Sequence, residues 1–190
     1  MVSETVARLR DATRDEHQRL EDSLDIFGRI SRPDARRRMV ERFHGLHAGA
    51  ESALSPMLAH VVGLDFAGRS RLPFLIADVR QLGGDPDALP MCAVSRPASL
   101  AEALGVLYVL EGSTLGGHVI GKRLAAEGHS DRGLTFLDPY RDQVGARWRA
   151  FLQVLERDTA SDVSRDAAVV GARTGFAMTQ DWLCAAAEAA

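Results

Sequence analysis

Apolar residues recur every three or four positions along most of the chain, which is the spacing of one face of an α-helix. The first such stripe runs from about Glu4 to Phe27, with Ser3 as a plausible N-cap and Gly28 as a plausible stop. Its members are Val6, Leu9, Thr13, His17, Leu20, Leu24 and Phe27. We therefore predict one helix over this segment, with this stripe facing the core.

Five further segments show the same periodicity. They run from Pro33 to about Met57, from Leu72 to Leu82, from Leu100 to Glu127, from Asp138-Pro139 to Leu155, and from Val163 to Ala189. Pro56 should kink or interrupt the second helix, Ser99 should cap the fourth, and the fifth should start at Asp138-Pro139. No convincing alternation of period two is present. The chain is expected to be all-α, with residues 1–190 forming one multi-helical domain.

Composition narrows the class of protein. With 46% hydrophobic and 26% charged residues the chain is typical of a globular protein. Its net charge of −3 gives no basic excess for nucleic-acid binding, and we expect no membrane span because no apolar run of 18 residues is present. Cys92 and Cys184 form neither a zinc pattern nor a disulfide framework. We expect a cytoplasmic protein without nucleic-acid or membrane partners.

His17 breaks the pattern of the first helix. It lies in the middle of the apolar stripe, one turn after Thr13 and three residues before Leu20. A buried imidazole needs a partner for each ring nitrogen. Two interpretations are open: a core histidine bonded to a backbone carbonyl, or a ligand for a metal ion or a heme iron.

Four glycines break the pattern of the fourth helix, within LYVLEGSTLGGHVIGKRL. Each of Gly112, Gly116, Gly117 and Gly121 costs a helix about 0.8–1 kcal/mol relative to alanine, so something should offset the loss. Gly112 and Gly116 are one turn apart and share a face. Close packing of another helix is one explanation, and a flat ligand lying against bare backbone is the other.

Together, an imidazole on one helix and a bare strip on another suit a planar iron porphyrin held between them. Arg10 lies seven residues before His17, on the same face and about 10.5 Å away along the axis, which suits an anionic propionate at the heme edge. Tyr108 lies one turn before Gly112 and can donate to a propionate as well. A solvated arginine and a rim aromatic are the alternative interpretations of these two residues.

The chain resembles the heme oxygenase family, in particular its bacterial biliverdin-producing branch. The similar stretches are LRDATRDEHQRLE, LGVLYVLEGSTLGGHVIGKRL, FLDPYRDQVGARWRAFLQVLE and, more weakly, ARTGFAMTQDWL. They are distributed over most of the chain. The family is all-helical with a single domain, which agrees with the helix pattern.

This resemblance implies that heme is both cofactor and substrate and that O2 and a reductant open it to biliverdin, CO and iron. His17 then matches the proximal iron ligand, and Arg10, Tyr108 and Arg173 match propionate partners. The distal helix over the iron corresponds to Gly112, Ser113, Gly116 and Gly117, whose backbone and hydroxyl groups would hold water for proton delivery. The electron donor would be a ferredoxin or a flavoprotein reductase, and a bacterial phytochrome is a candidate recipient of biliverdin.

One departure and four alternatives accompany this resemblance. The simplest alternative is a helical interaction module, which would explain the helices but not His17 or the glycine cluster. Mammalian-type enzymes have an Asp in the distal helix, and EGSTLGGHVIGKRL has none. A heme carrier or sensor would use the same binding residues without turnover. A thiaminase-like enzyme would need a reactive cysteine in the pocket, and a metal-carboxylate bundle would need a second pair like Glu41 and His44, which we do not find.

Overall fold

The computed structural model describes residues 3–184, most of which are helical. The α-helices are α1 (Glu4–Ala12), α2 (Arg14–Leu24), α3 (Ile26–Ile30), α4 (Pro33–Leu58), α5 (Leu72–Gln81), α6 (Leu100–Ala126), α7 (Val144–Asp158) and α8 (Asp162–Cys184). Single 3-10 turns lie in the connections: η1 (Ala67–Arg69), η2 (Pro86–Ala88), η3 (Thr135–Leu137) and η4 (Arg141–Gln143). Residues 3–184 contain no strand, which confirms the all-α prediction.

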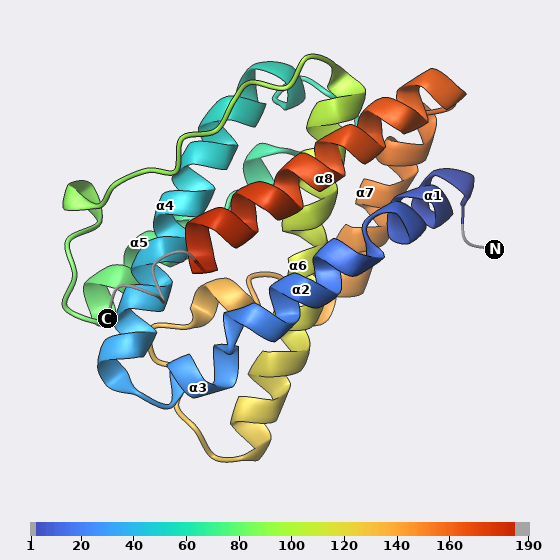
Figure 1. Ribbon diagram of the computed structural model, residues 1–190. Coiled ribbons are helices and arrows are strands. Elements are labelled where there is room, and N and C mark those ends of the chain that lie inside the picture. Colours follow the sequence, from blue (N-terminus) through green and yellow to red (C-terminus); the bar gives the residue numbers. More distant parts are fainter. Residues whose placement is uncertain (1–2, 185–190) are drawn as a thin grey trace.

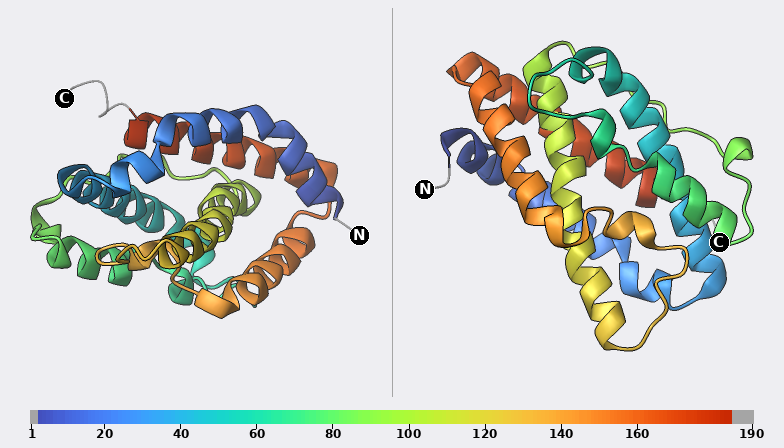
Figure 2. Two further views of the ribbon diagram at one scale, coloured as in Figure 1. Left: turned by 90° about the horizontal axis from the view of Figure 1, so that it is seen from below. Right: turned by 180° about the vertical axis from the view of Figure 1, so that it is seen from behind.

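The long helix α6 lies at the centre of the fold, and α8 packs against it, crossing it obliquely (Figures 1 and 2). Glycines let the two helices approach closely. A Cβ at Gly105 would clash with the carbonyl oxygen of Ala168, and a Cβ at Gly171 would clash with the carbonyl oxygen of Glu102. Helices α1 and α2 run beside α8, while α7 and α4 also pack against α6. Phe151 and Leu155 of α7 are fully buried in the core around α6.

The N-terminal segment forms three helices instead of the single helix that its stripe predicts. The first break is at Thr13, whose hydroxyl donates to the carbonyl oxygen of Leu9 at 2.8 Å, an interaction that competes with regular helical geometry. The second break is at Asp25, which has a φ of 39° and caps α3 by accepting from the N–H of Gly28. Gly28 therefore lies inside α3, so the predicted stop at this residue is wrong.

The other boundaries agree more closely with the sequence. Ser3 and Ser99 accept hydrogen bonds as N-caps of α1 and α6, and Gly128 follows α6 with a φ of 72°. Helix α4 includes Pro56 and ends at Leu58, so the proline does not interrupt it. The predicted start of the fifth helix is wrong, because α7 begins at Val144, after a 3-10 turn, and not at Asp138-Pro139. The predicted end of the last helix at Ala189 lies outside the described residues.

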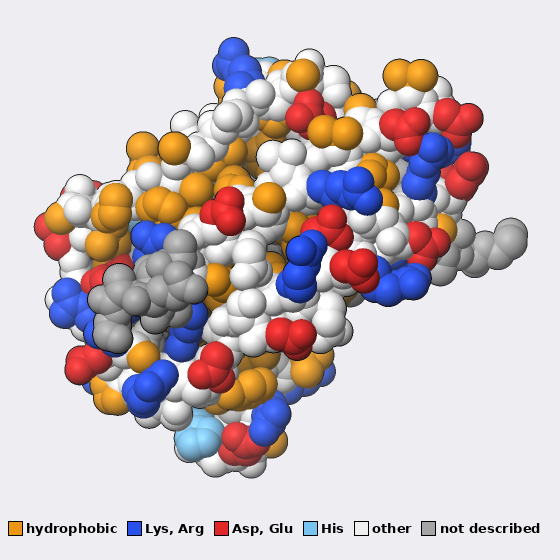
Figure 3. Space-filling view, viewed as in Figure 1, with side chains coloured by type: hydrophobic (Ala, Val, Ile, Leu, Met, Phe, Trp, Pro, Cys, Tyr) orange, Lys and Arg blue, Asp and Glu red, His pale blue; other side chains and the backbone are white. Residues whose placement is uncertain are grey.

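Side chains of both charge signs alternate along α1, α2 and α8 on the face shown in Figure 3. Ion pairs join the first helix to the start of α8: Arg8 with Asp162 and Asp166, and Arg165 with Glu4. All of these pairs are partly exposed, so each contributes little to stability.

Helix α6 is long and apolar enough, by length and composition alone, to cross a membrane: an 18-residue window within it has a mean hydropathy of 1.3. Of this window, 61% is buried inside the fold, as in the core helix of a globular protein.

Candidate active site

The glycines of α6 divide into two kinds when a Cβ is placed on each. At Gly117 the Cβ would clash with the carbonyl oxygen of Leu137, so close packing of the η3 turn explains this glycine. At Gly116 the Cβ would meet no atom within 4 Å, and at Gly112 only the Trp148 ring at 3.8 Å. Packing within the protein therefore does not require a glycine at either position. We call Gly112 and Gly116, which lie one turn apart on α6, together with the backbone between them, the bare strip.

His17 lies on α2, and its side chain is 59% exposed. The expectation that it faces the core is therefore wrong. The break at Thr13 starts a new helix, and the His17 ring packs in a T-shaped arrangement against Phe176 on α8, with ring centroids 5.8 Å apart. Its Nδ1 lies 3.6 Å from a Glu21 carboxylate oxygen. The imidazole is thus accessible to a ligand approaching from outside the core.

Two side-chain contacts connect the N-terminal helices to the face of α6 that carries the bare strip. Tyr108, Gly112, Gly116 and Arg123 recur at intervals of four, four and seven residues, so they share one face of α6. At one end, burial raises the pKa of Tyr108, and the nearby guanidinium of Arg10 partly offsets this rise. At the other end, the guanidinium of Arg123 lies 4.3 Å from the centre of the Phe27 ring. His17 lies between Arg10 and Phe27 in the sequence, as the bare strip lies between Tyr108 and Arg123.

The two predicted arginines differ in how strongly the protein already engages them. Arg173 donates two hydrogen bonds to the carbonyl oxygen of Ala12, which the helix break leaves without its usual partner, and it lies 3.6 Å from Glu16. Among residues 3–184 no carboxylate forms an ion pair with Arg10, which is exposed. Arg10 is therefore the more available partner for an anionic group.

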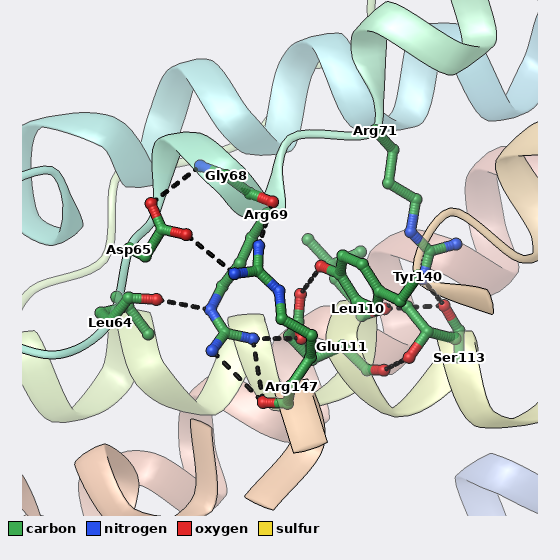
Figure 4. Close-up of polar contacts among 11 residues, drawn as sticks. Leu64, Asp65, Gly68, Arg69, Arg71, Leu110, Glu111, Ser113, Tyr140 and Arg147 are labelled. Carbon is green, nitrogen blue, oxygen red and sulfur yellow. Dashed lines mark hydrogen bonds and ion pairs between the residues drawn. The ribbon is translucent and has the colours of Figure 1, made fainter. Parts of the chain in front are cut away.

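Ser113 follows the first glycine of the bare strip and connects to a polar chain that the sequence did not reveal. Its hydroxyl donates to the carbonyl oxygen of Leu110 at 2.7 Å and accepts from the guanidinium of Arg71 at 2.8 Å (Figure 4). The backbone N–H of Arg71 donates to Glu51 at 2.9 Å, and Glu51 lies 3.3 Å from the ring of His47. Burial lowers the pKa of His47, which favours its neutral form.

A second buried network lies at Glu111, the residue before Gly112. Its carboxylate is bound by Arg69 at 2.5 Å and by the hydroxyl of Tyr140 at 2.8 Å (Figure 4). A cavity of about 10 Å³, the size of one water molecule, is lined by residues of both networks, including Glu51, Arg71 and Glu111. No spacing rule identifies Arg69 or Arg71, because both lie in a connection and their partners are about 40 positions away.

The structure also bears on the alternatives. In residues 3–184, no three His, Cys, Asp or Glu side chains lie close enough together to hold a metal ion. His44 and His47 are both buried, and His118 binds Asp138 at 2.9 Å, in the connection before α7. Burial raises the pKa of Cys92 and of Cys184, which disfavours the thiolate that a cysteine nucleophile requires.

The residues fit a planar iron-containing group. An accessible imidazole supplies an axial ligand of the usual type, and a cradle without side chains, which a Cβ at Gly116 would enter, suits the face of a ring. Arg10 and Tyr108 carry hydrogen-bond donors at one end of this face.

Comparisons with known proteins agree with this fit. The family model described as heme oxygenase matches residues 79–185. A protein named heme oxygenase from Xanthomonas campestris pv. campestris (strain 8004) is 40% identical over 160 residues, covering 82% of this chain and 92% of that protein. This chain belongs to the heme oxygenase family. It is accordingly an enzyme, and the family acts on heme.

Solved structures of heme oxygenases share the fold. The NO- and CO-bound heme oxygenase from Neisseria meningitidis superposes with a TM-score of 0.73 at 22% identity, covering 94% of this chain and 89% of that one. Heme oxygenase from Leptospira interrogans superposes with a TM-score of 0.74 at 17% identity, covering 96% and 100%. At these identities the two structures support the fold alone.

Proposed function

We propose that this heme oxygenase binds heme between His17 and the bare strip and opens it to biliverdin, CO and iron, using O2 and a reductant. The observation that carries the proposal is an accessible imidazole on α2 together with two glycines on α6 that no packing contact requires. Heme serves as cofactor and substrate, and when bound it supplies the redox chemistry of its own oxidation.

On the proximal side, His17 would bind the iron through Nε2. Its Nδ1 lies 3.6 Å from Glu21, and a carboxylate at this nitrogen favours a proton on Nδ1, which leaves Nε2 free to coordinate. Arg10 and Tyr108 would bind propionates at one end of the ring. Arg173 is a further candidate, although it would have to share its guanidinium with Ala12 and Glu16.

On the distal side, Gly112 and Gly116 would keep side chains away from the reacting face, while Gly117 holds α6 close to the η3 turn. Ser113 would bring a hydroxyl to the edge of this face. The oxygen of Ser113 accepts a hydrogen bond from Arg71, and its hydroxyl proton is donated to the carbonyl oxygen of Leu110. We assign proton delivery to water held by Ser113 and the backbone, with Arg71, Glu51 and His47 as the polar chain behind it.

The partners follow from this reaction. The enzyme would take electrons from a ferredoxin or a flavoprotein reductase, and a bacterial phytochrome would be one recipient of biliverdin. We place the enzyme in the cytoplasm, where such reductants and heme are available.

A titration with hemin followed by ascorbate in air tests the proposal. We expect one Soret band at a one-to-one ratio, which decays as the red absorption of biliverdin grows. A Soret band that persists with reductant and oxygen would instead identify a heme carrier or sensor, the alternative that shares these binding residues. Absence of any Soret band would refute heme binding.

A further inference from the structure

Glu111 lies one residue before the bare strip and is directed away from it, into the protein. Its side chain is only 4% exposed, and both carboxylate oxygens are bound. Arg69 contacts Oε2 at 2.5 Å, and the hydroxyl of Tyr140 donates to Oε1 at 2.8 Å (Figure 4).

The network fastens several segments at one point behind α6. The guanidinium of Arg69 also donates to the carbonyl oxygen of Leu64, before η1, and to that of Arg147, in α7. Tyr140 belongs to the connection between η3 and η4. The first residues of the bare strip are therefore tied to three parts of the chain that are distant in sequence.

A buried ion pair is weak evidence for stability, because desolvation offsets much of its attraction. Hydrophobic residues of similar volume would fill the same space without that cost. Directional bonds, by contrast, define where a helix lies. Helix α6 needs this most at Gly112 and Gly116, where a Cβ would meet at most one atom within 4 Å and where glycine makes the helix locally less stable.

We propose that Glu111 is a positioning residue, held by Arg69 and Tyr140, that fixes the backbone from Gly112 to Gly116 in the place where it meets the substrate ring. This inference rests on the proposed function for its catalytic consequence. Its structural part, a local restraint on the bare strip, holds for the protein without heme.

The test compares Glu111→Gln and Tyr140→Phe with a matched control, Glu102→Gln. Glu102 lies in the first turn of the same helix, ten residues before Gly112, and its carboxylate accepts from the N–H of Ala98. In the heme-free protein, amide hydrogen exchange is measured at 112–116 and at 103–107 of α6. In the presence of hemin, kcat, KM and the isomers of the bilin product are measured.

We expect Glu111→Gln to speed exchange at 112–116 about tenfold, as for loss of one charge-assisted hydrogen bond, while exchange at 103–107 stays unchanged. Tyr140→Phe should act at the same amides to a smaller extent, and it carries the test if Glu111→Gln does not fold. Turnover should fall in kcat with little change in KM, or the mixture of bilin isomers should change. Glu102→Gln should match the wild type in exchange at 112–116, in turnover and in the isomers of the product.

Unchanged exchange at 112–116 in both folded variants would overturn the proposal. So would an equal rise along all of α6, because a purely stabilising contact acts on the whole helix. If wild type binds no hemin or does not turn it over, the proposed function fails, yet the exchange data still decide whether Glu111 restrains the bare strip.

Discussion

Replacing Gly116 by alanine separates the stability of α6 from its function. A Cβ at this position meets no atom within 4 Å, so the change should remove the helix penalty of glycine at no packing cost. The gain should be about 0.8–1 kcal/mol in the free energy of unfolding. For a chain of this size, this corresponds to a rise in Tm of roughly 2–4 °C.

The same methyl group should damage the binding of hemin. It would project from the bare strip into the space that we assign to the ring, and the resulting misfit should weaken affinity about tenfold, equivalent to about 1.4 kcal/mol. Gly116→Ala should therefore be more stable than wild type and yet bind hemin less tightly. Thermal unfolding without heme and a hemin titration followed by absorbance measure the two effects.

Two neighbouring glycines provide controls. At Gly121 a Cβ would meet only the Cβ of Asp138 at an ordinary 3.7 Å, so Gly121→Ala should stabilise α6 and leave hemin binding unchanged. Gly117→Ala should destabilise by about 1–3 kcal/mol, because its Cβ would clash with the backbone of Leu137. If Gly116→Ala bound and degraded hemin as Gly121→Ala does, the assignment of the bare strip would be refuted.

Three further changes have defined outcomes. Burial lowers the pKa of His47, so the unfolded chain binds more protons than the folded one below pH 6.5, and the free energy of unfolding falls as the pH drops. In urea titrations from pH 7 to 5, His47→Gln should reduce the slope of this free energy against pH by up to about 1.4 kcal/mol per pH unit. An unaltered slope would contradict the neutral form of His47 in the folded protein. Ser99→Ala removes the N-cap of α6 and should lower the free energy of unfolding in urea by about 1 kcal/mol without altering hemin affinity. An unchanged free energy of unfolding would argue against the cap. Arg10→Gln should weaken hemin binding, and the loss should shrink as salt is added. The loss should exceed that of Arg173→Gln, because Arg173 already binds Ala12 and Glu16. A larger loss of hemin affinity in Arg173→Gln would exchange the roles of the two arginines.

The helical periodicity of the sequence was sufficient to predict the long elements. The caps Ser99 and Gly128 bound α6 closely, because both act through local geometry that a residue type alone indicates. The break at Thr13 was not predictable, since threonine also occurs within helices and its hydroxyl bond to Leu9 competes only in this context. The missed break explains why His17 was expected to face the core and instead lies exposed.

The candidate site shows the same division. The glycine pattern singled out α6, but only the structure separates Gly117, which packing requires, from Gly116, which it does not. The polar networks behind the bare strip were missed because Arg69 and Arg71 acquire their roles from partners that the fold brings to them. A charged residue in a connection is normally solvated, and nothing local marks it as buried.

The central claim is that His17 binds the iron of a ring lying against the bare strip. The most direct measurement is the absorption spectrum of the His17→Ala complex with hemin, recorded without and with added imidazole. We predict that the variant loses the wild-type Soret band and that imidazole restores it, because the cradle remains and only the axial ligand is missing. A His17→Ala complex with the wild-type spectrum, unaffected by imidazole, would contradict the claim.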